Sequence, residues 1–218
     1  MSDTSYLTVD AAPGEGVDVE LEIKRSRFLT RLRRVTTEGA ARAVVDERRT
    51  TFFDARHHCS AFVLGPDGRT ARSSDDGEPA GTAGVPMLQV LQKHGLTDTV
   101  AVVTRYFGGI KLGAGGLVRA YSDAVAQAVD AVGTRRVRLS SLLRIDVDYA
   151  EAGVVEDQLR GLTLPDGTAV VVDGVEWSDR AHISVAVPAG SEAELGVALA
   201  TISAGRLTAE PVGERWAG

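Results

Sequence analysis

The stretch RYFGGIKLGAGGLVRAY, residues 105–121, places five glycines within nine positions between an apolar run and an apolar helix. The run that leads into it, TVAVVTRYF (99–107), is apolar without alternation, which is typical of a strand covered on both faces. Apolar residues after it recur at steps of three and four, at Leu117, Tyr121, Ala124, Ala128 and Val132. This spacing predicts a helix with one buried face, so the stretch predicts a strand, a tight glycine turn and a helix.

A glycine turn before a helix is a common cradle for anions, because its backbone N–H groups can face a phosphate and the helix N-terminus adds partial positive charge. Arg105, Lys111 and Arg119 flank the turn. The candidate backbone ligands are Gly108, Gly109, Gly113, Gly115 and Gly116. The turn lacks the Gly-Lys pair of a P-loop and the last glycine of the dinucleotide fingerprint, so no cofactor is predicted. Glycines also serve tight turns and close packing, and the spacing leaves that structural role open.

A second glycine-rich segment, SSDDGEPAGTAG (73–84), carries Asp75, Asp76 and Glu78. Three carboxylates beside glycines could hold Mg²⁺ and a phosphate, because that ion prefers oxygen ligands. Acidic glycine-rich segments more often only turn the chain, and no nucleophile with a neighbouring base accompanies this one. We therefore predict these three residues as ligand-binding candidates, but neither a metal site nor a catalytic site.

The single cysteine, Cys59, lies in the short motif HHC and excludes an internal disulfide. If residues 57–59 form a strand, His58 points away from His57 and Cys59, because successive side chains alternate. No second cluster of cysteine and histidine completes four metal ligands. Core packing is therefore the predicted role of Cys59.

A basic strand is predicted early in the chain. Residues 17–23 alternate apolar and acidic side chains, which indicates a half-buried strand, and RSRFLTRLRR (25–34) predicts a second one. On the second strand one face would be apolar and the other would carry Arg25, Arg27, Arg31 and Arg33. We expect Arg31 and Arg33 to face solvent and the four arginines to offer a binding face for RNA. Ordinary solvated arginines are the alternative.

The charge of the chain is divided unequally. The 218 residues have a net charge of −6, with 18 Lys and Arg against 17 Asp and Glu in residues 1–136, and 6 against 13 in residues 137–218. A polyanion should therefore meet the first part, because attraction follows the local field. No apolar stretch approaches the ~18 residues of a membrane span, and the first residues are polar and acidic. We expect a cytoplasmic protein without a membrane partner.

Two domains are predicted, residues 1–136 and 137–218. The first adds helices at 38–49 and 86–95, a strand at 59–64 and a turn at 65–68. The second reads as strand 143–147, helix 151–160, strands 168–175 and 181–187, helix 192–204 and strand 207–214. This order is the βαββαβ plan of ferredoxin-like folds, with capping boxes expected at Asp148 and Ser191.

Taken together, the motifs of the first part resemble the IMPACT/YigZ family. They are KRSRF, DARHHC, SSDDGEPAGTAG and RYFGGIKLGAGGLVRAY, in the order that the family has them. The resemblance covers about the first 135 residues. The remainder is similar in architecture to the C-terminal domain of the family, which resembles domains of elongation factor G.

The resemblance implies an α+β protein. Its N-terminal domain would have the left-handed βαβ fold of a ribosomal-protein domain, and its C-terminal domain would be ferredoxin-like. The family pattern carries over to Asp75, Asp76, Glu78, Arg105, Gly108, Gly109, Gly113, Gly116 and Arg119. Lys111 stands where bacterial relatives have an apolar residue, which leaves its role open.

Eukaryotic relatives regulate translation, and the first hypothesis is accordingly a nonenzymatic, translation-associated binder of RNA, the ribosome or a nucleotide-like phosphate. The second is an enzyme that acts on a small phosphorylated substrate, suggested by kinases that share the fold. The third is an adaptor for a protein in translation control. The sequence leaves these three open, and it leans away from an enzyme because no nucleophile with a base is visible.

Overall fold

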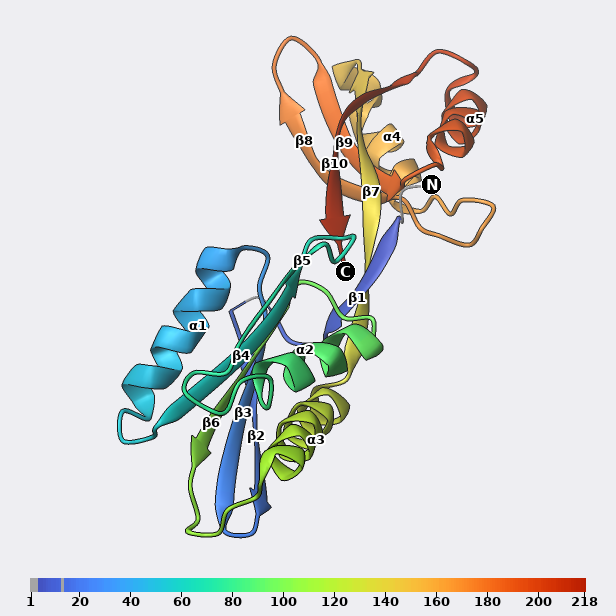
Figure 1. Ribbon diagram of the computed structural model, residues 1–218. Helices are drawn as coiled ribbons and strands as arrows, with labels where there is room; N and C mark the ends of the chain where they lie inside the picture. Colours follow the sequence, from blue (N-terminus) through green and yellow to red (C-terminus); the bar gives the residue numbers. More distant parts are fainter. Residues whose placement is uncertain (1–3, 13) are drawn as a thin grey trace. The chain divides into compact units, whose positions relative to one another are not determined.

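The computed structural model describes residues 4–12 and 14–218 and has two sheets and five helices, so the predicted α+β class is confirmed (Figure 1). Contacts divide the chain into two compact units, residues 1–136 and 137–218. Each unit has its own hydrophobic core. In the described part of the chain, none of the helices combines the length and the apolar character that crossing a bilayer requires.

The N-terminal unit is built on a five-stranded antiparallel sheet with the order β2-β3-β6-β4-β5. Its strands are β2 (Gly16–Ile23), β3 (Ser26–Arg34), β4 (His57–Leu64), β5 (Thr70–Ser74) and β6 (Thr99–Tyr106). Its helices are α1 (Glu38–Thr51), α2 (Gly84–Lys93) and α3 (Ala114–Val132). Helix α1 covers one face of the sheet, and α2 and α3 cover the other (Figure 1).

Strand β6 is the centre of this arrangement. Val100 and Val102 pack into the cluster under α1, whereas Ala101 and Val103 pack into the cluster under α2 and α3. All four side chains are fully buried. Burial on both faces explains why the sequence of this strand shows no alternation.

The expected basic face of β3 is wrong in two respects. Arg25 lies outside the strand, in the two-residue β2–β3 turn, where Lys24 and Arg25 both adopt positive φ. Arg31 and Arg33 lie on the strand face beside α1, but both pair with Glu47 and their side chains are only 17% exposed. Helix α1 packs against this side of the sheet and encloses the two arginines. The alternation of side chains along a strand cannot show which of its faces a helix will cover.

The other arginine of this face, Arg27, is paired as well. Its guanidinium donates to Glu20 at 2.6 Å on the neighbouring strand, and it lies over the ring of Tyr106. Asp18 accepts from Arg31 and lies 2.9 Å from the buried Arg48 of α1. Glu20 and Asp18 of β2 therefore pair with Arg27, Arg31 and Arg48, whereas Glu47 of α1 pairs with Arg31 and Arg33.

The C-terminal unit has the sheet order β10-β7-β9-β8 with antiparallel neighbours and two helices, as in a ferredoxin-like fold. Its elements are β7 (Thr134–Val147), α4 (Tyr149–Arg160), β8 (Val171–Trp177), β9 (Ala181–Pro188), α5 (Glu192–Ser203) and β10 (Ala209–Ala217). Strand β1 (Ser5–Val9), which the sequence did not reveal, belongs to the N-terminal unit, where Leu7 forms a parallel bridge with Leu96.

The two expected capping boxes do not form. The Asp148 carboxylate caps no N–H of α4 and instead pairs with Arg180 at 2.6 Å. Ser191 has φ −98° and ψ 14°, and its hydroxyl makes no capping bond. A capping side chain needs extended backbone at its own position, which Ser191 lacks.

The glycine stretch owes part of its composition to packing. A Cβ built on Gly108 would lie 2.0 Å from the carbonyl carbon of Arg25 and 2.2 Å from its oxygen. The backbone after β6 therefore lies directly on the β2–β3 turn, and the amide of Gly108 donates to Ser26 Oγ at 3.2 Å. Only glycine fits such an approach of two backbones.

Substitution of Gly108 by Ala should lower the free energy of unfolding by about 1–3 kcal/mol, because the added methyl group overlaps backbone that cannot move freely. Gly115 is the matched control, since a Cβ there meets nothing within 4 Å and it lies in α3. Gly115→Ala should be neutral or stabilising by up to about 1 kcal/mol. Urea denaturation of both variants checks this, and equal effects would contradict the packing explanation.

Candidate functional site

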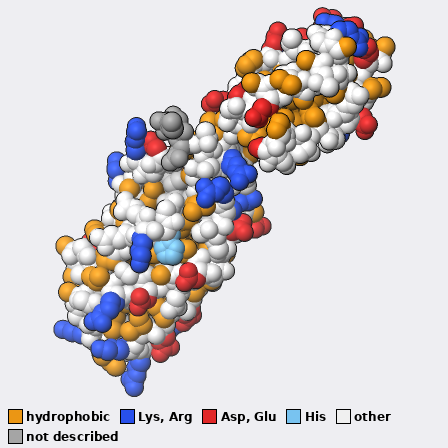
Figure 2. Space-filling view, turned by 90° about the vertical axis from the view of Figure 1, so that its right-hand side faces the viewer, with side chains coloured by type: hydrophobic (Ala, Val, Ile, Leu, Met, Phe, Trp, Pro, Cys, Tyr) orange, Lys and Arg blue, Asp and Glu red, His pale blue; other side chains and the backbone are white. Residues whose placement is uncertain are grey.

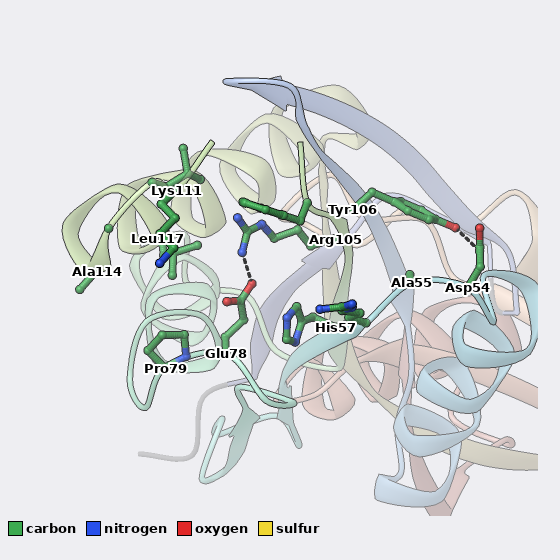
Figure 3. A pocket seen from close by; sticks show the side chains of 14 residues that line it. Asp54, Ala55, His57, Glu78, Pro79, Arg105, Tyr106, Lys111, Ala114 and Leu117 are labelled. Carbon is green, nitrogen blue, oxygen red and sulfur yellow. Dashed lines mark hydrogen bonds and ion pairs between the residues drawn. The ribbon is translucent and has the colours of Figure 1, made fainter. Parts of the chain in front are cut away.

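The N-terminal unit has a pocket of about 770 Å³ where the end of β6, the start of β4 and the start of α3 converge. Figure 3 shows Arg105 and Glu78 facing each other in its middle, with Lys111, Ala114 and Leu117 to one side. It is lined by Asp54, Ala55, Arg56, His57, Glu78, Pro79, Arg105, Tyr106, Phe107, Lys111, Leu112, Gly113, Ala114 and Leu117. The glycine stretch and the acidic segment therefore meet in one cavity.

A buried ion pair forms the floor of the pocket. Arg105 Nη1 donates to Glu78 Oε1 at 2.6 Å, and the side chains are only 7% and 4% exposed. The Tyr121 hydroxyl donates to the same oxygen at 2.8 Å. Arg105 Nη2 reaches Ser26 Oγ at 3.4 Å, while Arg105 Nε is buried without a hydrogen-bond partner. The guanidinium is thus held in place but not fully satisfied.

Beneath the pair lies a sealed hydrogen-bond chain. Cys59 Sγ donates to the Tyr121 hydroxyl at 3.3 Å, and both residues are fully buried. Burial raises the pKa of the Cys59 thiol to about 12, and burial together with Cys59 and Glu78 raises the pKa of Tyr121 above its ordinary value. Both groups therefore stay protonated at neutral pH, and Cys59 has the core position predicted for it.

The exposed charged side chains of the pocket are two cations, Arg56 and Lys111, and one carboxylate, Asp54, which accepts from Tyr106. Arg56 and Lys111 are exposed, and within the described ranges no carboxylate lies within ion-pair distance of either one. Helix α3 begins after Gly113 with no side chain capping it and no acidic residue in its first turn. Free N–H groups and the helix dipole make this helix start attractive to an anion.

The two aspartates of the acidic segment lie outside the pocket and hold the segment in shape. Asp75 accepts from the backbone N–H groups of Gly81 at 2.7 Å, Ala83 at 3.0 Å and Gly84 at 2.8 Å. Burial of Asp75 acts to raise its pKa, but these bonds hold the pKa below its ordinary value of 3.8. Asp75 therefore works as a cap for the start of α2.

Asp76 joins neighbouring elements. Its carboxylate pairs with Arg49 of α1 at 2.7 Å and accepts from the His58 N–H at 2.6 Å, while its carbonyl lies 2.9 Å from His57 Nδ1. No group of three His, Cys, Asp or Glu in the described part of the chain is arranged to hold a metal. All three carboxylates of the segment are thus used by the protein itself.

The structure brings together only some of the candidate residues. Arg105, Glu78, Lys111 and Gly113 line the pocket. The remaining candidates, which do not line it, are Arg25, Arg27, Arg31, Arg33, Asp75, Asp76, Gly108, Gly109, Gly115, Gly116 and Arg119. Arg119 is exposed on α3, with Nε 3.5 Å from the Gly115 carbonyl.

Several residues of the pocket escaped sequence reasoning. Arg56 and Asp54 lie in the α1–β4 connection, and Tyr106 and Phe107 end the central strand. The Tyr106 hydroxyl donates to Asp54 at 2.6 Å, which ties the two segments together, as Figure 3 shows. Arg56 belongs to the motif DARHHC, and this motif was the feature of the sequence that could have identified Arg56 as a site residue.

Basic side chains also gather next to the pocket. Figure 2 shows Lys and Arg side chains interspersed with hydrophobic ones at the lower end of the N-terminal unit, the level at which Figure 1 places the β2–β3 turn and the loop before α3. Lys24 and Arg25 of the β2–β3 turn are exposed, as are Phe107, Ile110 and Lys111 of the stretch between β6 and α3. The two loops beside the pocket therefore carry both basic and apolar exposed side chains.

Comparisons with known proteins agree with the motifs. The Impact N-terminal domain family matches residues 24–129. IMPACT family member YvyE of Bacillus subtilis is 47% identical over 156 residues, covering 72% of this chain and 70% of YvyE. IMPACT family member YigZ of Escherichia coli is 41% identical over 197 residues, covering 89% and 94%. A crystal structure of a hypothetical protein is 39% identical, with a TM-score of 0.62 over 96% of this chain and 98% of the other.

Asp75→Asn should reduce stability near pH 7 by about 0.5–2 kcal/mol, as loss of a helix cap does. Because the folded pKa of Asp75 lies below 3.8, its contribution is fully present above that value and is lost as the pH falls through the folded pKa. Urea denaturation from about pH 7 to about pH 3 should show the gap between wild type and variant closing. A gap that persists unchanged at the acidic end would contradict the capping role.

The Cys59 thiol should not react with Ellman's reagent near pH 8 in the folded protein, because it is buried and its raised pKa leaves almost no thiolate. One equivalent should react once the protein is unfolded in guanidinium chloride. Rapid modification under native conditions would show that the chain of hydrogen bonds beneath Glu78 opens in solution.

Proposed function

We propose that this chain, which belongs to the IMPACT family, is a cytoplasmic, translation-associated regulator that binds RNA phosphate in the Arg105 pocket without catalysing a reaction. The observation that carries the proposal is the unneutralised rim of the pocket. Arg56, Lys111 and the uncapped start of α3 surround one hollow, whereas Arg27, Arg31 and Arg33 of β3 are paired with acidic residues. Unpaired cations and free N–H groups at one place favour phosphate.

The aromatic residues of the pocket favour a nucleic acid over inorganic phosphate. Phe107 is 56% exposed, and Tyr106 lines the same hollow. Bases of single-stranded RNA stack on such rings, and stacking contributes about 1–3 kcal/mol for each base. Cations beside exposed aromatic side chains therefore suit a nucleotide with its base unpaired.

A binding role fits the chemistry of the pocket better than catalysis. Cys59 and Tyr121 are sealed in the core with raised pKa values, so neither supplies a nucleophile at neutral pH. The Glu78 carboxylate oxygen Oε1 already accepts from both Arg105 and Tyr121, so that oxygen is occupied within the protein. The half-buried His57 ring is the remaining candidate, and no hydroxyl or thiol is bonded to it among the described residues.

The division of charge assigns the binding to the N-terminal unit. We infer that residues 1–136 are the Impact-type domain and that residues 137–218 are a separate domain, with a boundary near 133–139. The second part carries 6 basic and 13 acidic residues, so it repels a polyanion at long range. Ribosomal RNA is a partner of the right chemistry for the first part.

One observation favours an adaptor as the second candidate. Phe53 is 85% exposed in the α1–β4 connection, and Ile110 is 43% exposed in the glycine stretch. Exposed apolar side chains around a basic hollow also suit a protein partner. An enzyme that acts on a small phosphorylated substrate remains the third, since a pocket of about 770 Å³ has the size of a small-molecule site.

The full chain should bind single-stranded RNA at low salt, with log affinity falling by about 0.7 for each phosphate contact per log unit of salt. Lys111→Glu and Arg56→Glu should each weaken binding and reduce that slope, because both side chains are exposed at the rim. Fluorescence anisotropy with a labelled oligouridylate across a salt series measures both quantities.

The matched control is Lys93→Glu, which changes the charge equally at the end of α2, outside the pocket. It should leave the affinity close to that of the wild type. No binding by the wild type at low salt, or equal losses for Lys93→Glu and Lys111→Glu, would overturn the proposal of RNA binding at this pocket and leave the adaptor and the small-substrate enzyme.

A further inference from the structure

A second hollow, of about 350 Å³, lies between α1 and the edge strand β5. Helix α1 packs over β4 and β6, so the α1 side of β5 stays uncovered. The register places Arg72 opposite Phe62 and Ser74 opposite Ser60, so these four residues face the hollow together. Its lining is Arg42, Val45, Asp46, Arg49, Ser60, Phe62, Arg72, Ser73 and Ser74.

The lining carries three arginines and three serines against one carboxylate, that of Asp46, which lies 3.8 Å from Arg49. Arg72 is exposed, and no carboxylate pairs with it in the part of the chain that the structure describes. Arg42 is 74% exposed and pairs with Glu38 one helical turn away at 3.2 Å, an exposed contact that water and salt weaken. Guanidinium and serine hydroxyl groups are among the side-chain groups that contact the phosphates of a nucleic-acid backbone.

Asp76 contacts a residue of this hollow and a residue of the Arg105 pocket. Arg49 lines the second hollow and pairs with Asp76, and the Asp76 carbonyl contacts His57, which lines the first. The two hollows lie on opposite faces of the sheet, since Phe62 packs on the α1 side and Leu117 on the side of α2 and α3. A ligand that contacts both must pass around the end of the sheet at Asp76, next to the start of β4, which requires several nucleotides.

We propose that the hollow between α1 and β5 is a second phosphate subsite, and that the ligand is single-stranded RNA of several nucleotides running from the Arg105 pocket past Asp76 to Arg72. This inference rests on the proposed function and deepens it, because it specifies that the ligand is an RNA strand and not a mononucleotide. The floor of the subsite is mostly polar, with Phe62 only 9% exposed, which suits a backbone rather than an apolar helix.

The test compares ligands of different length on the full chain. AMP, an oligouridylate of about 3 nucleotides and one of about 12 nucleotides are titrated against wild type, Arg72→Glu and the double variant Arg42→Glu/Arg72→Glu. The long RNA should bind the double variant roughly tenfold more weakly, and its salt slope should fall by about 0.7 for each phosphate that the variant no longer neutralises. AMP and the short RNA should bind the variants as they bind the wild type.

Arg69→Glu is the matched control. Its side chain is 86% exposed on the same β4–β5 hairpin, lies outside the hollow, and carries the same charge change. Thermal melts establish that each variant is folded, which is expected because Arg42, Arg69 and Arg72 are all exposed. The effect of Arg69→Glu measures the loss due to net charge alone.

The outcomes separate this inference from the proposed function. Equal losses for Arg69→Glu and Arg72→Glu, or equal affinity for short and long RNA, would overturn the second subsite. If Lys111→Glu still weakens binding in that case, the Arg105 pocket survives as the RNA site. Binding of a poly-glutamate peptide that depends on Arg72, without binding of RNA, would overturn the inference in favour of an acidic protein partner.

Discussion

The N-terminal unit depends on the buried ion pair of Arg105 and Glu78. Each charge costs several kcal/mol to remove from water, so the pair is stable only where both groups find partners. Tyr121 supplies one from α3 and Ser26 another from the β2–β3 hairpin. The pair therefore joins the central strand, the acidic segment, a helix and a hairpin, and it fixes the distance between the segments that form the pocket.

The same requirement, that a buried charge must have a partner, explains where the other charged side chains of the unit lie. Arginines enclosed by α1, such as Arg31 and Arg48, have acidic partners from β2 or α1, because an unpaired charge there would be costly. Cations at the pocket rim, such as Arg56 and Lys111, have none among the described residues and remain in water. The number of arginines in a segment thus says little about binding, and what matters is which of them the fold leaves without a partner.

The sequence predicted the elements whose burial produces a hydrophobic periodicity or an uninterrupted apolar run. These include β6, α3 and the βαββαβ order of the second unit. It did not predict β1 and β5, which are only five residues long. Such short strands are held by backbone hydrogen bonds, and these leave no recognisable hydrophobic pattern in the sequence. For the site, it identified Arg105, Glu78 and Lys111 from motifs. It could not show that Arg33 is enclosed or that Asp75 caps α2, because both depend on tertiary packing.

The glycines of the stretch differ in what requires them. Gly108 is demanded by the backbone of Arg25, and Gly109 and Gly113 adopt positive φ, which disfavours other residues. Gly115 has ordinary backbone and open space around the position of its missing side chain, so the fold does not need glycine there. It lies in the first turn of α3, where a side chain would screen the free N–H groups from an approaching anion. Packing therefore does not account for Gly115, which lies beside the pocket without lining it, and the proposed phosphate site would be helped by an open backbone there.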